Sequence, residues 1–444
     1  MSKRSRKSRS LEPVETTIES LSHDGRGIAH INGKITFIDG ALPNEKIIFQ
    51  YTNHHGQFDE GKTTEVLQAA KERITPACPY YSICGGCNLQ HLDHNAQIIH
   101  KQEVLLKQLE HFGNVTPQEI LPPLTGPIWG YRKKARLSIR FVIKKDQLLV
   151  GFREKNGRFI TDMDCCEILE PSIGKKIEAI KTCLRSLEAY MDIPQLEVAI
   201  GDERAALIVR HLKELSKNDH DKLCLFAEQN QFDLYLQPKG LETVHKIWPE
   251  NTEDRLRYRL DKYQVELLFH PCDFTQVNST INEQMVERAL TLLDLKLTDH
   301  VLDLFCGLGN FTIPIAKFCK QVVGIEGNQQ MVDRGKENAR HNQLNNAFFY
   351  KHDLSAPLPH TDWAKEKYQK ILLDPPRTGA SEIIAHIPTF QPERIVYVSC
   401  NPATLARDAK TLVHEHGYRL EKAGIMDMFP HTAHVESIAL FVAQ

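Results

Sequence analysis

The stretch Val301-Leu-Asp-Leu-Phe-Cys-Gly-Leu-Gly-Asn310 decides the fold of this chain. Its apolar start predicts a buried strand, and Gly307 and Gly309 allow a tight turn into a helix. A second apolar strand ends in Glu326, about 20 residues further on, which is where an acid binds ribose hydroxyls. From Gln264 onward strands and helices alternate, which predicts a parallel, doubly wound α/β sheet.

Further strand ends carry polar residues. Ile371-Leu-Leu-Asp-Pro-Pro-Arg377 and Ile395-Val-Tyr-Val-Ser-Cys-Asn-Pro402 each stop abruptly at a proline turn, and Lys351-His-Asp353 follows another strand. In open α/β sheets, ligands bind just beyond the carboxyl ends of the strands. Proline excludes helix from the residue before it, so Asp374 is held at the strand exit. We therefore expect Asp374 and Cys400 to face a common site, with Cys400 as a nucleophile.

Composition bounds the remaining possibilities. The chain has 444 residues, of which 41% are hydrophobic, and a net charge of -2, so two to four ordinary domains are expected. No apolar run approaches the roughly 20 residues that span a bilayer, and the basic start lacks the apolar stretch of a secretory signal. The 11 cysteines then favour metal binding or catalysis over disulfides, and we expect a cytoplasmic protein without membrane contact.

The pattern predicts a sequence of domains. Residues 1–10 form a basic tail, and short alternating runs over 11–70 predict a small β-barrel. A central α+β domain over 71–262 follows, and its helix at 91–112 is a candidate to pack on the catalytic domain. The α/β domain occupies 263–444.

Cys78, Cys84 and Cys87 lie close enough to ligate one metal centre, and the two glycines between the last two let the backbone fold round it. The fourth ligand is expected from the pair Cys165-Cys166. Four thiolates suit zinc or an iron–sulfur cluster, and spacing alone leaves both open.

Basic residues gather at the start of a predicted strand. Alternation places Arg132, Lys134, Arg136 and Arg140 roughly together, with Tyr131 beside them. Such a strand suits an RNA backbone and one stacked base, and the alternative is a solvated sheet face.

The motifs occur together in an order that resembles a known family. His23-Asp-Gly-Arg-Gly-Ile-Ala29, with the segment from Phe37 to Glu45, resembles the TRAM domain, an RNA-binding barrel of the OB type. The segments Phe274-x-Gln-Val-Asn278, Asp303-x-Phe-Cys-Gly-x-Gly-Asn310, Asp-Pro-Pro-Arg377, Ser-Cys-Asn-Pro402 and His-Val-Glu436 resemble the RNA 5-methyluridine methyltransferases. With the barrel and the cysteine motif, the resemblance covers nearly the whole chain. It is strongest to the bacterial group that methylates uracil C5 in 23S ribosomal RNA.

This resemblance implies a class I, Rossmann-like methyltransferase domain, an N-terminal TRAM barrel and a central domain with a [4Fe-4S] cluster. It implies that Cys400 attacks the pyrimidine ring and that Glu436 is the base, with His434 as a rival. The implied S-adenosyl-L-methionine residues are Gln276, Phe305, Asn310, Glu326, Asp353 and Asp374. The implied cluster ligands are Cys78, Cys84, Cys87 and Cys166, with Cys165 as the alternative to the last.

The expected function is therefore methyl transfer from S-adenosylmethionine to C5 of a uridine in 23S ribosomal RNA by a monomer. A transfer RNA uridine methyltransferase would use the same chemistry. A non-catalytic RNA-binding assembly factor would use only the barrel, the cluster and the basic strand. A nicotinamide dehydrogenase is disfavoured, because the glycine turn lacks the Gly-x-Gly-x-x-Gly pattern.

Overall fold

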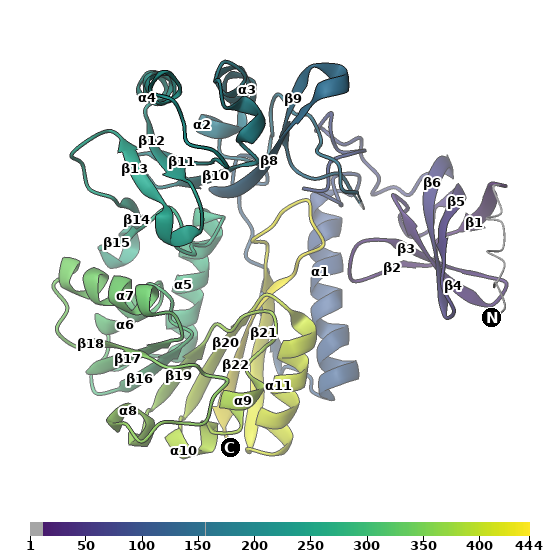
Figure 1. Ribbon diagram of the computed structural model, residues 1–444. Coiled ribbons are helices and arrows are strands. Elements are labelled where there is room, and N and C mark those ends of the chain that lie inside the picture. Colours follow the sequence, from purple (N-terminus) through teal and green to yellow (C-terminus); the bar gives the residue numbers. More distant parts are fainter. Residues whose placement is uncertain (1–11, 156) are drawn as a thin grey trace, which may run out of the picture. The chain divides into compact units, whose positions relative to one another are not determined.

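The computed structural model describes residues 12–155 and 157–444, so the basic tail predicted over 1–10 lies outside the described residues. The chain divides into two compact units (Figure 1). The first contains Met1–Val104 together with Phe429–His434, and the second contains Leu105–Met428 together with Val435–Gln444. The domain boundaries expected at residues 70 and 262 stay predictions.

The first unit is built on a curled sheet, drawn in purple in Figure 1. Its strand order is β1-β5-β6-β4-β3-β2, and within the described residues of this sheet β4 and β6 pair in parallel while the other neighbours pair antiparallel. The strands are Val14–Thr17, Ser20–Leu21, Gly27–Ile31, Lys34–Asp39, Lys46–His54 and Phe58–Gln68 for β1 to β6. Ile18, Ile38, Ile47 and Phe49 form its core. A Cβ on Gly61 would lie 2.5 Å from the Phe49 ring, so only glycine fits there.

Helix α1 (His94–Gln108) continues into a π-helical turn, Leu109–Gly113. This turn packs against α11 (Pro402–His414) in the second unit. The backbones approach so closely that a Cβ on Gly113 would lie 2.8 Å from the carbonyl oxygen of Ala406. The end of the helix predicted over 91–112 thus contacts α11, a helix of the α/β domain.

The middle of the second unit is a mixed sheet with the order β13-β12-β11-β10-β8-β9. Helices α3 and α4 lie on one of its faces (Figure 1). The strands are β8 Lys134–Val142, β9 Gln147–Gly151, β10 Gln195–Ile200, β11 Ala205–Arg210, β12 Phe232–Gln237 and β13 His245–Trp248. The helices are α2 Pro171–Gly174, α3 Ile177–Arg185 and α4 Lys217–Asn230.

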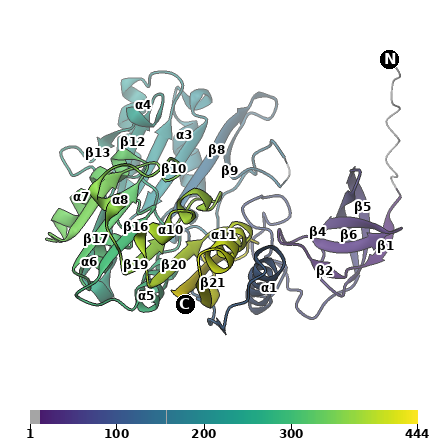
Figure 2. The same cartoon turned by 90° about the horizontal axis from the view of Figure 1, so that it is seen from below.

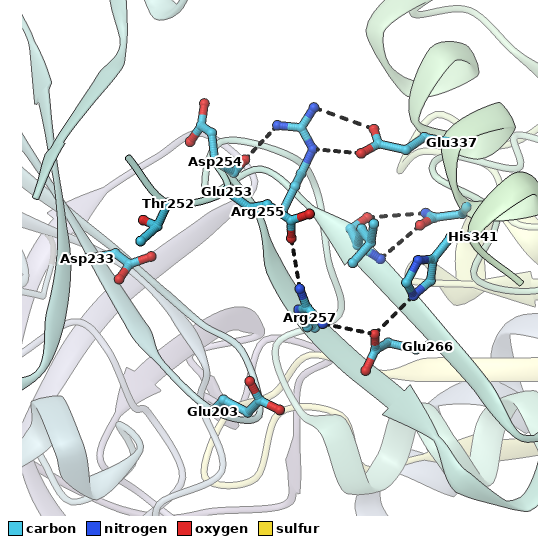
Figure 3. A network of polar contacts seen from close by, with 12 residues as sticks. Glu203, Asp233, Thr252, Glu253, Asp254, Arg255, Arg257, Glu266, Glu337 and His341 are labelled. Atoms are coloured by element: carbon cyan, nitrogen blue, oxygen red, sulfur yellow. Dashed lines mark hydrogen bonds and ion pairs between the residues drawn. The ribbon is translucent and has the colours of Figure 1, made fainter. Parts of the chain in front are cut away.

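The hairpin of β14 (Leu256–Leu260) and β15 (Val265–Phe269) follows the middle sheet and is tied to α7 (Gln329–His341) by ion pairs (Figure 3). Arg255 reaches Glu337 at 3.2 Å, and His341 reaches Glu266 at 3.0 Å. Arg257 also lies 3.3 Å from Glu266. The Arg255–Glu337 ion pair and the His341–Glu266 contact therefore connect the hairpin to α7, while Arg257 and Glu266 pair within the hairpin.

The α/β sheet has the order β18-β17-β16-β19-β20-β22-β21-β7. Strands β16 to β20 are mutually parallel, and β22 runs antiparallel between β20 and β21. The strand order reverses between β16 and β19, and ligands bind at such a switch point in open α/β sheets. The strands are β7 Glu119–Ile120, β16 His300–Leu304, β17 Gln321–Glu326, β18 Ala347–Lys351, β19 Lys370–Leu373, β20 Arg394–Ser399, β21 Tyr418–Met426 and β22 Glu436–Ala443.

Helices cover both faces of this sheet (Figure 2). In addition to α7 and α11 they are α5 Ser279–Leu293, α6 Thr312–Ala316, α8 Asp362–Lys365, α9 Ser381–Ile384 and α10 Ile387–Phe390. The central strands are buried on both sides, which explains their continuous apolar sequence. The predicted doubly wound fold is confirmed. None of the described helices has the length and apolar character needed to cross a bilayer.

Candidate active site

The turn after β16 has left-handed backbone at the two glycines, as the sequence predicts, and also at Phe305, which the sequence did not predict. Phe305, Gly307 and Gly309 have φ angles of 66°, 54° and 99°. A Cβ on Gly309 would lie 2.9 Å from Ile313, so glycine is required. The amides of Phe305 and Cys306 both donate to the Ile325 carbonyl, at 2.9 and 3.1 Å. The turn is therefore fixed to the end of β17.

The acid at the end of β17 closes this turn from the other side. Glu326 accepts hydrogen bonds from the amides of Gly307 at 3.1 Å and Asn328 at 2.9 Å. Asp353, two residues after β18, is exposed and accepts from the amide and hydroxyl of Ser355 at 3.0 and 2.6 Å. These bonds lower the pKa of the Asp353 carboxyl. Both carboxylates thus lie at the carboxyl edge of the sheet, as predicted.

Asn310 and Gln276 differ in how they are held. Asn310 exchanges amide hydrogen bonds with Asn282 of α5 at 2.8 and 3.0 Å, and it accepts one from the Tyr258 hydroxyl at 2.9 Å. Gln276 is partly buried in the segment before α5, where the next carbonyl, that of Val277, accepts from the Lys133 amide at 2.8 Å. Among the described residues, no hydrogen bond joins Gln276 to the strand ends.

The loops after β19 and β20 are tied together. The Asn401 side chain donates to the carbonyl oxygen of Arg377 at 3.0 Å, and its Oδ1 accepts from the Ala403 amide as the N-cap of α11. The Asp374 amide donates to Leu304 O at 3.3 Å, which holds it at the switch point. Burial raises the pKa of the Asp374 carboxyl to about 7.

Cys400 and Glu436 come together through strand pairing. Ser399 of β20 pairs with Ser437 of β22, so the antiparallel register sets Cys400 opposite Glu436 one step further on. Cys400 is partly buried. Burial, followed by the negative charges of Glu436 and Asp374, raises the pKa of the Cys400 thiol to about 11, against the opposing charge of Arg377. A thiol, a carboxylate and a second acid therefore share one environment.

The cysteine motif lies in the first unit, apart from Cys165 and Cys166, which belong to the second. Cys84, Cys87 and Cys166 are buried, and the Gly86 amide points at the Cys84 sulfur at 3.4 Å. Among residues 12–155 and 157–444, no group of three or more His, Cys, Asp or Glu side chains is arranged to hold a metal ion. The predicted cluster ligands thus stay a prediction.

The basic strand keeps two exposed arginines, Arg136 and Arg140, and its role in RNA contact stays a prediction. Lys133 pairs with Asp202 at 3.0 Å and Arg136 with Glu197 at 2.8 Å, while Lys134 donates to the carbonyl oxygen of Asp273. Tyr131, expected to stack on a base, is only 5% exposed. Of the four basic residues predicted to share a face, Arg136 and Arg140 are exposed, and Arg136 pairs with the acidic Glu197 of a neighbouring strand, which local sequence could not reveal.

Comparisons with known proteins agree with this geometry. The model of the tRNA (Uracil-5-)-methyltransferase family matches residues 204–444, and the TRAM domain model matches residues 12–47. A relative from Alcanivorax borkumensis, named 23S rRNA (uracil(1939)-C(5))-methyltransferase RlmD, is 52% identical over 99% of this chain and 98% of its own. The chain belongs to the RNA uracil-C5 methyltransferase family. The resemblance to this family that the sequence motifs indicated is thereby confirmed.

Other uracil-C5 methyltransferases extend the comparison. A relative of the same name from Hahella chejuensis is 50% identical over 99% of both chains. The solved structure of the Pyrococcus abyssi tRNA (uracil-54, C5)-methyltransferase in complex with S-adenosyl-L-homocysteine is 25% identical, with a TM-score of 0.75 over 96% of this chain and 99% of that one. The architecture of this methyltransferase is therefore shared along nearly the whole chain.

Sequence reasoning missed residues that support the uracil-C5 methyltransferase site. Asn282 and Tyr258 hold Asn310, and neither belongs to a motif. The side chain of Asn401 was available as a signal, because Asn before Pro at a helix start is a typical N-cap. The hydrogen bond from the Asn401 side chain to the Arg377 carbonyl joins two loops that only the folded structure brings together, so the sequence could not predict it.

Proposed function

We propose that this protein transfers the methyl group of S-adenosylmethionine to C5 of a uridine in 23S ribosomal RNA. The observation that supports the chemistry best is the pairing that sets Cys400 opposite Glu436 beside Asp374 at the carboxyl edge of the sheet. The ribosomal substrate is favoured by relatives about half identical over the full length, whose names specify uracil 1939. The domain boundaries at residues 70 and 262 and the roles of the individual residues are part of the same proposal.

The first step makes C5 of the uracil ring nucleophilic. Uracil C5 does not attack a methyl group unaided, because it carries too little electron density. The Cys400 thiolate adds to C6, and the electrons of the C5–C6 double bond move onto O4 as an enolate. The enolate then attacks the methyl carbon through C5, and the electrons of the S–CH3 bond remain on the sulfur of S-adenosylhomocysteine.

The last step restores the ring. Glu436 takes the C5 proton, and the electrons of that C–H bond form the C5–C6 double bond again. The C6–S bond breaks, and its electrons leave with Cys400 as thiolate. His434 is the alternative base. The target base must be extruded from any helical stack to reach the thiol.

We assign the methyl donor to the switch point. Glu326 would bind the ribose hydroxyls, while Phe305 in the glycine turn, Asp353 and Asp374 would line the remainder of the site. Gln276 and Asn310 complete the proposed set. Because burial keeps Asp374 partly protonated near neutral pH, a bound sulfonium would draw it into the charged form.

The cysteine motif suits a [4Fe-4S] cluster by its donor chemistry, with zinc as the alternative. The ligands would be Cys78, Cys84, Cys87 and Cys166, with Cys165 as the rival for the last. The Gly86 amide aimed at the Cys84 sulfur would stabilise a thiolate there. The cluster would stabilise the surrounding fold. Iron, sulfide and zinc analysis of anaerobically purified protein tests this, with Cys84→Ser as the variant and Cys183→Ser as the matched control.

The uracil-C5 activity is tested with 5-fluorouridine in the RNA, because fluorine at C5 blocks proton removal and traps the covalent adduct. Unmodified 23S ribosomal RNA and transfer RNA transcripts are compared side by side, since the Pyrococcus abyssi structure is of a transfer RNA enzyme. We expect the adduct with 23S RNA and none with Cys400→Ala. An equal adduct with Cys400→Ala would refute the nucleophile, and a preference for transfer RNA would refute the substrate.

The proposal extends to the protein's setting. A cytoplasmic location follows from a ribosomal RNA substrate, and we propose a monomer, which sedimentation measures directly. Membership of the methyltransferase family counts against the alternative from another class, a non-catalytic assembly factor. It predicts that Cys400→Ala leaves ribosome assembly unchanged while no methyl group is ever transferred.

A further inference from the structure

The loop between β19 and α9 lies beyond the strand pairing of the α/β sheet. The last paired residue of β19 is Leu373, which lies opposite Leu304 of β16 and Tyr397 of β20. Residues 374–380 follow and lead into α9. We call this segment the Arg377 loop. Because no strand register extends to it, its course depends on the side chains that bind its backbone.

The carbonyl of Arg377 lies directly against the residues that follow Cys400. It accepts hydrogen bonds from the side chains of Asn401 at 3.0 Å and Thr404 at 3.4 Å. Asn401 is the next residue after Cys400 and the N-cap of α11. The positive charge of Arg377 also acts on the thiol, where it opposes the rise in the pKa that burial and the nearby carboxylates cause. Arg377 is therefore held close to the proposed nucleophile.

A buried carboxylate further along α11 provides two more attachments for the Arg377 loop. Asp408 accepts hydrogen bonds from the Ala380 amide at 2.8 Å and from the Tyr397 hydroxyl at 2.7 Å. Its other oxygen lies 2.7 Å from the guanidinium of Arg407. Arg407 in turn donates to the Thr378 carbonyl at 3.0 Å. We call Arg407 and Asp408 the loop anchor.

The loop anchor packs closely against the Arg377 loop. Gly379 has a φ angle of 80°, and a Cβ on it would lie 2.5 Å from Arg407 and 2.8 Å from Asp408. Asp408 is 2% exposed, and a buried carboxylate is costly to leave without partners. Its hydrogen bonds therefore favour one arrangement of the loop. The same helix begins at Pro402, so the anchor fixes the loop relative to Cys400.

We infer that the loop anchor positions Arg377 beside Cys400, an inference that rests on the proposed function only for the role of the thiol. A positive charge near a thiol favours the thiolate, which is the nucleophile. Without the anchor the loop can move Arg377 away, and Cys400 then reacts more slowly. Arg407 and Asp408 are positioning residues, because they act through the loop.

The test measures the reactivity of Cys400 in the protein alone. Wild type and Asp408→Ala are alkylated with iodoacetamide at pH 8, and the peptide containing Cys400 is quantified by mass spectrometry. The peptide containing Cys183 of α3 reports general loosening in the same digest. We expect Asp408→Ala to slow alkylation of Cys400 roughly threefold. Loss of the Asp408 charge by itself would lower the pKa of the thiol and speed the reaction. Asp408→Asn keeps an oxygen for the Ala380 amide and should recover most of the rate.

Further variants separate the loop from direct effects of charge. Arg407→Ala tests the anchor at a side chain that is 48% exposed, where the fold tolerates the change, and we expect a similar slowing. Lys410→Ala removes the same charge from an exposed site on α11 and should react as wild type. Arg377→Gln should also slow the reaction, and adding Asp408→Ala to it should slow it no further.

Two results would overturn the inference: unchanged or faster alkylation of Cys400 in Arg407→Ala, or a further loss when Asp408→Ala is added to Arg377→Gln. The alkylation needs neither RNA nor methyl donor. A wild type that forms no adduct with 5-fluorouridine RNA would therefore refute the proposed function without changing this result.

Discussion

The resting state of Cys400 offers the sharpest quantitative prediction. The pKa of its thiol is raised to about 11 from the ordinary value of 9.0, mainly by burial and then by the negative charges of Glu436 and Asp374. At pH 8 a pKa of about 11 leaves about 0.1% thiolate, whereas an ordinary thiol has about 9%. Because the thiolate is the nucleophile, alkylation of Cys400 at pH 8 should be about 100-fold slower than that of an unperturbed thiol.

The assay measures this without RNA or methyl donor. The protein is treated with iodoacetamide at a series of pH values from 7 to about 11.5, and the peptide containing Cys400 is quantified by mass spectrometry, with circular dichroism at each pH as the check for folding. The rate should rise throughout this range with a midpoint near 11. Glu436→Gln removes a negative charge and should move the midpoint down. A midpoint at or below 9 in the folded protein would refute the reasoning.

Other predictions concern the second acid, a helix cap and the first unit. Binding of S-adenosylmethionine, measured by calorimetry, should strengthen as the pH rises through about 7 because Asp374 becomes charged there, and Asp374→Asn should abolish this dependence; an unchanged pH profile would count against it. Asn401→Ala removes the N-cap of α11 and should cost about 1 kcal/mol of stability, seen as a lower thermal midpoint of the second unit. Phe49→Ala should destabilise the curled sheet by roughly 3–5 kcal/mol in denaturant titration, because it leaves a cavity where the Phe49 ring packs on Gly61. A smaller loss would mean that the surrounding residues close this cavity.

The position of the proposed base was beyond prediction from the sequence. His434-Val-Glu436 is a motif only by resemblance, and an acid at a strand start has many ordinary uses. Its meeting with Cys400 requires β22 to insert antiparallel between β20 and β21, in a register that sets Ser399 against Ser437. Likewise, Asn88 and Ala433 are 345 residues apart in the chain, and only folding brings them together.

The sequence by itself determined the local features of this protein: the buried strands, the glycine turn at Gly309 and the proline exits that present Asp374 and Cys400. These features depend on backbone sterics and on the hydrophobic pattern within about ten residues, so a short stretch of sequence is enough to predict them. Only the tertiary structure decided which side chains meet, because strand register and the partners of buried polar groups are set by packing between distant segments. It paired Cys400 with Glu436, neutralised Arg136 with Glu197 and placed the loop before Glu436 among residues near the other end of the chain.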